Sequence, residues 1–269
     1  MGRSTVEQLT VKFNGSTWSY QRAGEGPPLV WLHGLWGEPG WELHHQRLAE
    51  RYTVYAPALP GYEGSTAPEW LADMEDVATL LAEFLEALPL DRPHMTGHSL
   101  GGWAAAELAV FRPSSVRSLV LVDPLGLAID WTRIPNIFYN DPAALPGIFF
   151  ADPSVPAAHR YVPPPVEWDE RFIMNRVAST RVAFDPYLHS RKLGVRLRFA
   201  NVPTLIIWGE RDALLLADHA KEWRARMPKA DVSIVKGAGH FPHVEKPEES
   251  VALMLDFLGG VPGSKEVSR

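Results

Sequence analysis

The sequence predicts an α/β protein with a mostly parallel sheet and helices on its flanks. Between Leu29 and Gly237, six short apolar runs have the length of strands buried on both faces. They alternate with segments whose apolar residues recur at helical spacing, which requires right-handed crossovers between parallel strands. The six runs are LVWLHG, YTVYAP, HMTGHS, VRSLVLVD, TLIIWG and VSIVKG.

A hairpin is predicted ahead of these runs. Val6–Phe13 and Thr17–Gln21 are both rich in strand-forming residues, and Asn14-Gly15 lies between them. An Asn-Gly pair in this position is a strong signal for a tight turn. The chain is therefore expected to open with two antiparallel strands.

The predicted helices fill the gaps between the apolar runs. In a sheet of this kind ligands bind beyond the carboxyl ends of the strands, so the loops that follow the runs are the places to look for chemistry. The helical segments are MEDVATLLAEFLEAL, LGGWAAAELAVF, LADHAKEWRARM and PEESVALMLDFL.

One long segment, residues 126–200, interrupts the alternation. It is rich in proline and aromatic residues, contains no convincing strand, and has its best helical pattern over residues 169–184. An insertion of this length between two strands is typical of a lid or functional subdomain. We expect residues 1–125 and 201–269 to form the core and residues 126–200 to form a helical cap.

The motif Gly97-His98-Ser99-Leu100-Gly101 lies between a predicted strand and a predicted helix. Gly-x-Ser-x-Gly in this context predicts a nucleophile elbow, in which small neighbours allow a sharp turn that exposes the serine. A helix-initiating turn without catalytic function is the alternative. We interpret Ser99 as a candidate nucleophile.

A serine nucleophile needs a base, and the base needs an orienting group. His240 follows the last strand-like run, and Asp212 follows the run before it. His243 and Asp123 are the alternatives, because His243 is close in sequence to His240 and Asp123 also ends a run. The order Ser99, Asp212, His240 is typical of hydrolases with this elbow.

Acyl transfer also needs hydrogen-bond donors for the developing oxyanion. Leu100 offers its backbone N–H from the first turn of its helix, where N–H groups have no intrahelical partner. The loop WLHGLWGEPGW follows an early strand, and we expect the N–H of Leu35 to be the second donor.

Composition excludes several classes of function. The net charge of −6 argues against nucleic acid and anionic membranes as partners, and the chain has no cysteine. No secretory signal, membrane span, metal-ligand cluster or dinucleotide-binding glycine pattern stands out. We expect a cytoplasmic monomer or homodimer with a small-molecule substrate, no metal and no cofactor.

The order of these motifs resembles that of the α/β-hydrolase fold enzymes. His33-Gly34, ALPGYEGS, GHSLGG, VRSLVLVD, VPTLIIWGERD and GAGHFPHVEKPEE occur in sequence over residues 6–258. The resemblance implies an eight-stranded sheet with one antiparallel strand, a Ser99-Asp212-His240 triad and a mobile cap over the site. Two departures lie in ALPGYEGS, where the family often has Asp at position 58 and Gly at position 63.

Three functions remain open at this point. We expect a carboxylic ester hydrolase for substrates with an apolar or aromatic part. The first alternative is a C–C bond hydrolase of the meta-cleavage type. The second is a protein of the same fold that does not hydrolyse its ligand: a lyase, an acyltransferase or a silent binding module. An HGxGPG loop and an Asn before the serine are usual in C–C hydrolases, and this chain has neither. The candidate substrate contacts are His33, Trp36, Trp131, Phe138, Tyr139, Phe149 and, for a carboxylate, Arg176.

Overall fold

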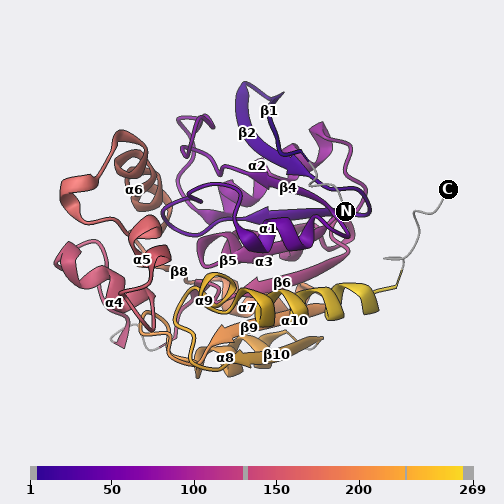
Figure 1. The fold of residues 1–269 in the computed structure, drawn as a ribbon. Helices are drawn as coiled ribbons and strands as arrows, with labels where there is room; N and C mark the ends of the chain where they lie inside the picture. Colours follow the sequence, from indigo (N-terminus) through magenta and orange to yellow (C-terminus); the bar gives the residue numbers. More distant parts are fainter. Residues whose placement is uncertain (1–4, 130–132, 228, 263–269) are drawn as a thin grey trace.

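A computed structural model describes residues 5–129, 133–227 and 229–262. An eight-stranded sheet with the order β1-β2-β4-β3-β5-β6-β9-β10 runs through its centre (Figure 1). Only β2 runs against the other seven, because it is antiparallel to both β1 and β4. The predicted mostly parallel sheet is therefore confirmed. The strands are β1 (Glu7–Phe13), β2 (Ser16–Ala23), β3 (Pro28–Leu32), β4 (Thr53–Pro57), β5 (His94–His98), β6 (Ser118–Val122), β9 (Thr204–Gly209) and β10 (Ala230–Val235).

The hairpin at the start of the chain has the predicted turn. Asn14 and Gly15 have φ values of 42° and 79°, and Phe13 pairs with Ser16 across the two-residue loop. Two successive positive φ values match the twist of the flanking strands, which is why Asn-Gly is favoured there.

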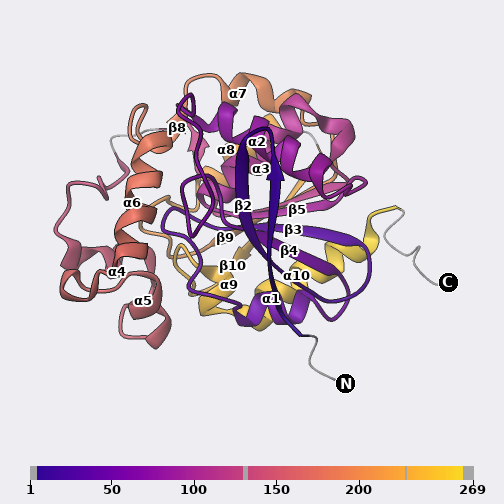
Figure 2. The same ribbon diagram turned by 90° about the horizontal axis from the view of Figure 1, so that it is seen from above.

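Helices cover both faces of the sheet. Figure 2 shows α2 and α3 on one side of the sheet and α1 and α10 on the other. Asp73 caps α2 by accepting hydrogen bonds from the N–H groups of Glu75 and Asp76. The helices of the core are α1 (Leu43–Leu48), α2 (Met74–Ala87), α3 (Leu100–Phe111), α8 (His219–Arg226), α9 (Pro242–Glu245) and α10 (Pro247–Gly260), with a 3₁₀ turn at Pro113–Ser115.

The strands are buried on both faces, as the continuous apolar runs predict. Along β3, Val30 and Leu32 belong to one apolar cluster, whereas Leu29 and Trp31 belong to a second cluster on the opposite face. This alternation follows from the two-residue period of a strand. Both layers therefore hold the carboxyl end of β3 in place, and the loop that carries Leu35 starts there.

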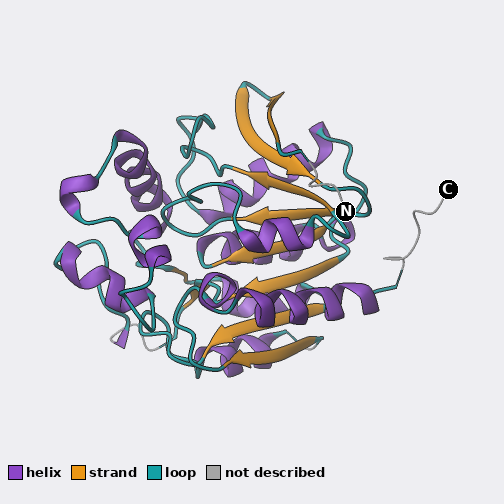
Figure 3. Cartoon of the chain, in the orientation of Figure 1, coloured by secondary structure: helices purple, strands orange, loops and turns teal. Residues whose placement is uncertain are grey.

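Three helices of the segment after β6, within residues 145–183, lie beyond the carboxyl ends of the parallel strands, on the side to which the strand arrows point in Figure 3. Asp169 caps the predicted helix α6 by accepting a hydrogen bond from the N–H of Phe172 at 2.7 Å. The segment contains α4 (Leu145–Phe149), α5 (Pro156–Tyr161), α6 (Glu170–Ala183) and α7 (Leu193–Arg196), with 3₁₀ turns at Pro142–Ala144, Pro165–Glu167 and Leu197–Phe199.

The expectation of no strand in this segment is wrong at two places. Gly126–Leu127 (β7) and His189–Ser190 (β8) form a short parallel pair. Two residues are too few to produce a periodic pattern, so no sequence signal marks them. The pair brings the two ends of residues 128–188 together, and the following turn at Leu197–Phe199 packs against α3.

No helix within the described ranges combines the length and the apolar character that crossing a membrane requires.

Candidate active site

Ser99 occupies a strained turn between β5 and α3. Its φ and ψ are 53° and −112°, in a region that non-glycine residues rarely adopt. The surrounding backbone holds it there, because the Ser99 N–H donates to Val122 and the Ser99 carbonyl accepts from Trp103 and Leu125. The structure therefore contains the sharp strand-to-helix turn that the glycine pattern predicts.

Gly97 and Gly101 are needed because backbone atoms lie where their side chains would be. A Cβ on Gly97 would meet the carbonyl of Gly101, and a Cβ on Gly101 would lie 2.6 Å from the carbonyl oxygen of His33. The turn thus depends on the close approach of three backbone segments, which is the physical reason for glycine at both positions.

Gly101→Ala is expected to destabilise the protein by about 3 kcal/mol or more, because backbone atoms have no low-cost way to move aside. Thermal denaturation monitored by circular dichroism measures the change. Gly147→Ala is the matched control, since nothing lies within 4 Å of a Cβ at that helical position. Equal melting temperatures for the two variants would contradict this account of the turn.

Ser99, His240 and Asp212 form a continuous hydrogen-bonded chain. Ser99 Oγ lies 2.9 Å from His240 Nε2, and His240 Nδ1 lies 2.7 Å from Asp212 Oδ2. A carboxylate can only accept here, so His240 carries its proton on Nδ1 and its Nε2 can accept the serine proton. All three residues are buried. This arrangement can deprotonate a serine during attack on an electrophile.

Backbone contacts fix both partners of Ser99. Asp212 Oδ1 accepts hydrogen bonds from the N–H groups of Leu214 and Leu215, each at 2.8 Å. The His240 N–H donates to the Phe149 carbonyl at 2.8 Å, and the His240 carbonyl accepts from His98 Nε2 at 2.8 Å. The backbone of His240 is therefore held by Phe149 of the inserted segment and by His98 of the elbow.

The loop that carries Leu35 lies directly against the elbow. A Cβ on Gly34 would be 3.4 Å from Ser99 Cβ. His33 Nε2 accepts from the Leu59 N–H at 3.0 Å, so its Nδ1 carries the proton and donates to the Gly34 carbonyl at 2.8 Å. Because Leu35 N–H belongs to the same peptide unit as that carbonyl, it points the opposite way. His33 thus orients this peptide unit, and both of its ring nitrogens already have protein partners.

Three side chains that no sequence motif identifies hold the same loop. Tyr62 donates to the Leu35 carbonyl at 2.9 Å, Ser179 donates to that carbonyl too, and Asn175 Nδ2 donates to the Trp36 carbonyl at 2.9 Å. Asn175 and Ser179 are buried polar residues four positions apart on α6, and therefore share one helix face. That spacing within RFIMNRVAST is the only signal that the sequence offers for them.

One of the candidate substrate contacts, Phe149, lies beside His240, and a second, Trp36, packs against Phe149. The ring of Phe149 is 5.6 Å from the imidazole of His240 and 4.6 Å from the ring of Trp36, measured between centroids. Phe149 therefore connects Trp36 to the catalytic histidine candidate.

The other candidates have different surroundings. Phe138 and Tyr139 contact Phe184, and Tyr139 is exposed. Arg176 stacks its guanidinium on Trp168 and Trp36, at 4.7 and 5.4 Å, a position that cation–π attraction favours. Trp131 lies outside the described residues.

Within the described part of the chain, two groups bring possible metal ligands together: Glu38-His44-His45 and Asp123-Asp212-His240. His45 Nδ1 accepts the backbone N–H of Glu42, so the proton of the neutral ring is on Nε2 and no lone pair remains for a metal. The first group therefore does not fit a metal ion. In the second group, both oxygens of Asp212 and both ring nitrogens of His240 already form hydrogen bonds within the protein.

The chain is similar to known proteins over most of its length. Residues 29–253 match the model of the alpha/beta hydrolase family. A protein of Mycobacterium tuberculosis described as uncharacterized is 27% identical, with 94% of this chain and 81% of the relative covered. Monoacylglycerol lipase ABHD6 of Mus musculus is 26% identical, with 89% and 78% covered. A solved structure, a membrane phospholipase A described as a bacterial virulence factor, is 28% identical with a TM-score of 0.80 and covers 97% of this chain and 87% of its own.

Proposed function

The chain belongs to the alpha/beta hydrolase family, and we propose that it hydrolyses carboxylic esters by nucleophilic catalysis from Ser99. The observation that carries this proposal is the hydrogen-bonded chain from Ser99 through His240 to Asp212. The placement of an unprotonated Nε2 at 2.9 Å from Ser99 Oγ meets the geometric requirement for a general base.

In the proposed reaction, Ser99 Oγ attacks the ester carbonyl carbon while its proton passes to His240 Nε2. The N–H groups of Leu35 and Leu100 stabilise the oxyanion of the tetrahedral intermediate. The intermediate collapses, the C–O bond to the alcohol breaks, and His240 returns the proton to that alcohol. A water molecule then repeats the attack on the acyl-enzyme and releases the acid.

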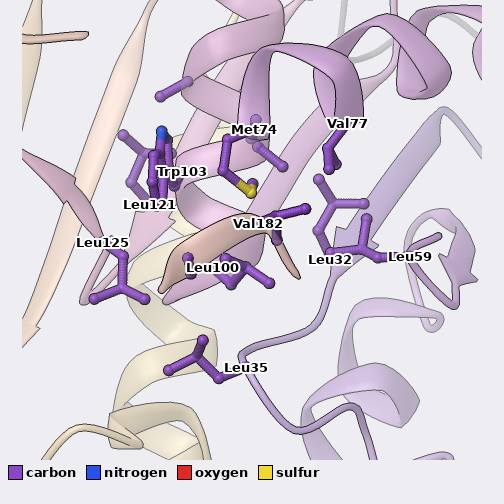
Figure 4. Packing of buried hydrophobic residues seen from close by; sticks show 14 of the residues in the cluster. Leu32, Leu35, Leu59, Met74, Val77, Leu100, Trp103, Leu121, Leu125 and Val182 are labelled. Atoms are coloured by element: carbon purple, nitrogen blue, oxygen red, sulfur yellow. The ribbon is translucent and has the colours of Figure 1, made fainter. Parts of the chain in front are cut away.

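The substrate is proposed to carry an apolar or aromatic part. Phe149 lies beside His240 and packs against Trp36, and Leu35, Leu100 and Leu125 belong to the apolar cluster shown in Figure 4. Such walls favour apolar groups over charged ones. The two lipases described above as relatives act on lipid esters according to their names, which agrees with this class.

We further propose that residues 126–200 act as a cap. Ser99 and His240 are 1% and 0% exposed, so a substrate can reach them only if a covering segment moves. Val182 of α6 lies among Leu32, Met74 and Leu100 (Figure 4), and Phe149 bonds to the backbone of His240. A cap that encloses the acyl group predicts a maximum rate at one acyl-chain length.

A panel of p-nitrophenyl esters of increasing acyl length, measured beside a vinylogous dienoic acid, tests the proposal. We expect ester turnover with an optimum length and covalent labelling of Ser99 by a fluorophosphonate, located by mass spectrometry. Turnover of the dienoic acid alone would identify C–C bond hydrolysis instead. No adduct on Ser99 would reject serine catalysis, and a rate independent of acyl length would reject the enclosing cap.

A further inference from the structure

A second buried carboxyl group lies beside Asp212. Asp123 follows β6 with a φ of 43°, is fully buried, and donates its N–H to the Ile207 carbonyl at 3.0 Å. Its Oδ1 accepts the N–H of Gly209 at 2.9 Å. Its Oδ2 is buried and has no hydrogen-bond partner within the described residues.

The two carboxyl groups are too close for both to be ionised. Asp123, Asp212 and His240 each have a ligand atom within 4.8 Å of those of the other two. Two negative charges at this distance in a dry interior repel strongly, so one of the carboxyl groups must keep a proton. Burial, and then the charge of Asp212, raise the pKa of Asp123 well above its usual value.

The hydrogen bonds decide which of the two is neutral. Asp212 accepts from the N–H groups of Leu214 and Leu215 and from His240 Nδ1, whereas among the described residues Asp123 accepts only from Gly209. Hydrogen bonds to a carboxylate favour its charged form. The negative charge therefore resides on Asp212.

We propose that Asp123 is a neutral carboxylic acid whose Oδ2–H donates a hydrogen bond to the Asp212 carboxylate. Asp123 is then a positioning residue that acts through Asp212, because it fixes the plane of the carboxylate that orients His240. Because the Asp123 carboxylic acid is neutral, it holds the Asp212 carboxylate in place without adding a second negative charge beside the His240 imidazolium that forms in the reaction. The inference rests on the proposed function, since it assigns a fourth member to the same site.

Two substitutions separate this role from a merely structural one. In Asp123→Asn, the amide oxygen can still accept from Gly209 and the amide nitrogen can still donate to Asp212. In Asp123→Leu, the volume is similar but the donor is lost. We expect Asn to keep kcat within about threefold of the wild type and Leu to lower kcat by about 10- to 100-fold with little change in KM.

Asp212→Asn is the comparison, because it forces the wrong tautomer on His240 and is expected to lower kcat by about 10⁴-fold. Asp123→Leu with wild-type kcat would overturn the proposal. Asp123→Asn with a loss as large as that of Asp212→Asn would also overturn it, since Asp123 would then be the charged acid of the triad.

Infrared spectroscopy detects the proton directly. A protonated carboxylic acid absorbs above the amide I region, and we expect the difference spectrum of wild type minus Asp123→Asn at neutral pH to show such a band, since the bands of Glu38 and Glu107 are common to both proteins and cancel. Absence of the band from the difference spectrum would overturn the proposal. Because this measurement needs no turnover, it still tests Asp123 if Ser99 fails to label and the proposed function is wrong.

The pH dependence of stability provides a third measurement. Asp123 faces Asp212, His240 and Glu245, and its raised pKa means that the folded protein holds a proton that the unfolded chain releases. Wild-type stability therefore falls relative to Asp123→Asn as the pH rises above about 4. We expect the melting temperature of Asp123→Asn minus that of the wild type to increase from pH 4 to pH 8. A difference that does not change with pH would overturn the proposal.

Discussion

Ser99→Ala and His240→Ala are each expected to lower kcat for ester hydrolysis by about 10⁴- to 10⁶-fold, and the double variant is expected to be no slower than either single one. Without Oγ there is no nucleophile, and without the imidazole nothing accepts the proton. The two residues act as one unit through the 2.9 Å hydrogen bond that joins them, so their losses do not add. Steady-state kinetics on the best p-nitrophenyl ester measures all three variants.

Exposed residues of the same types are the controls for this experiment. Ser114→Ala and His159→Ala alter a serine and a histidine on the surface, and both variants should keep wild-type kcat. Losses that multiply in the double variant would mean that Ser99 and His240 act independently. That result would remove the serine–histidine pair as the source of catalysis, even if each single variant were slow.

Much of the site could be predicted because its parts obey local rules. The six apolar runs and the Asn-Gly hairpin became the eight strands of the sheet. Asp212 and His240 follow β9 and β10, and parallel strands end at the same edge of a sheet, so sequence position alone brings them near Ser99. The catalytic roles of these residues stay predictions, but their proximity follows from the topology.

The remaining features depend on long-range packing that no local pattern records. Asn175 and Ser179 contact the loop of Leu35 and Trp36 only because α6 docks there, about 140 positions away along the chain. Arg176 stacks its guanidinium on Trp36 of the same loop and on Trp168, a contact that the sequence does not record. Asp123 ends a strand just as Asp212 does, and only the hydrogen bonds distinguish them.

The protein is expected to lose stability between about pH 6.5 and pH 4.5, because burial favours the neutral form of several histidines in the folded state. In the described part of the chain, burial lowers the pKa of six histidines, to about 3 for His45 and about 4 for His94. The unfolded chain binds protons near pH 6.5 that the folded protein does not bind, so stability is present above this pH and is lost below it. The six are His33, His44, His45, His94, His98 and His243.

Buried carboxyl groups oppose this loss without cancelling it. Burial raises the pKa of four of them within the same described ranges, to about 8 for Glu38 and about 7 for Glu107. The other two are Asp123 and Glu245. The folded protein keeps these protons to a higher pH than the unfolded chain does, so acid stabilises the folded state at these positions. Because the shifted histidines outnumber the shifted carboxyls, we expect a net loss of stability as the pH falls below 6.5.

Urea unfolding at several pH values measures this loss, and the slope of the unfolding free energy against pH counts the protons taken up. We expect a net uptake of protons on unfolding near pH 5.5, and each proton taken up lowers the unfolding free energy by about 1.4 kcal/mol per pH unit. A flat profile between pH 6.5 and 4.5 would mean that these histidines are charged in the folded protein.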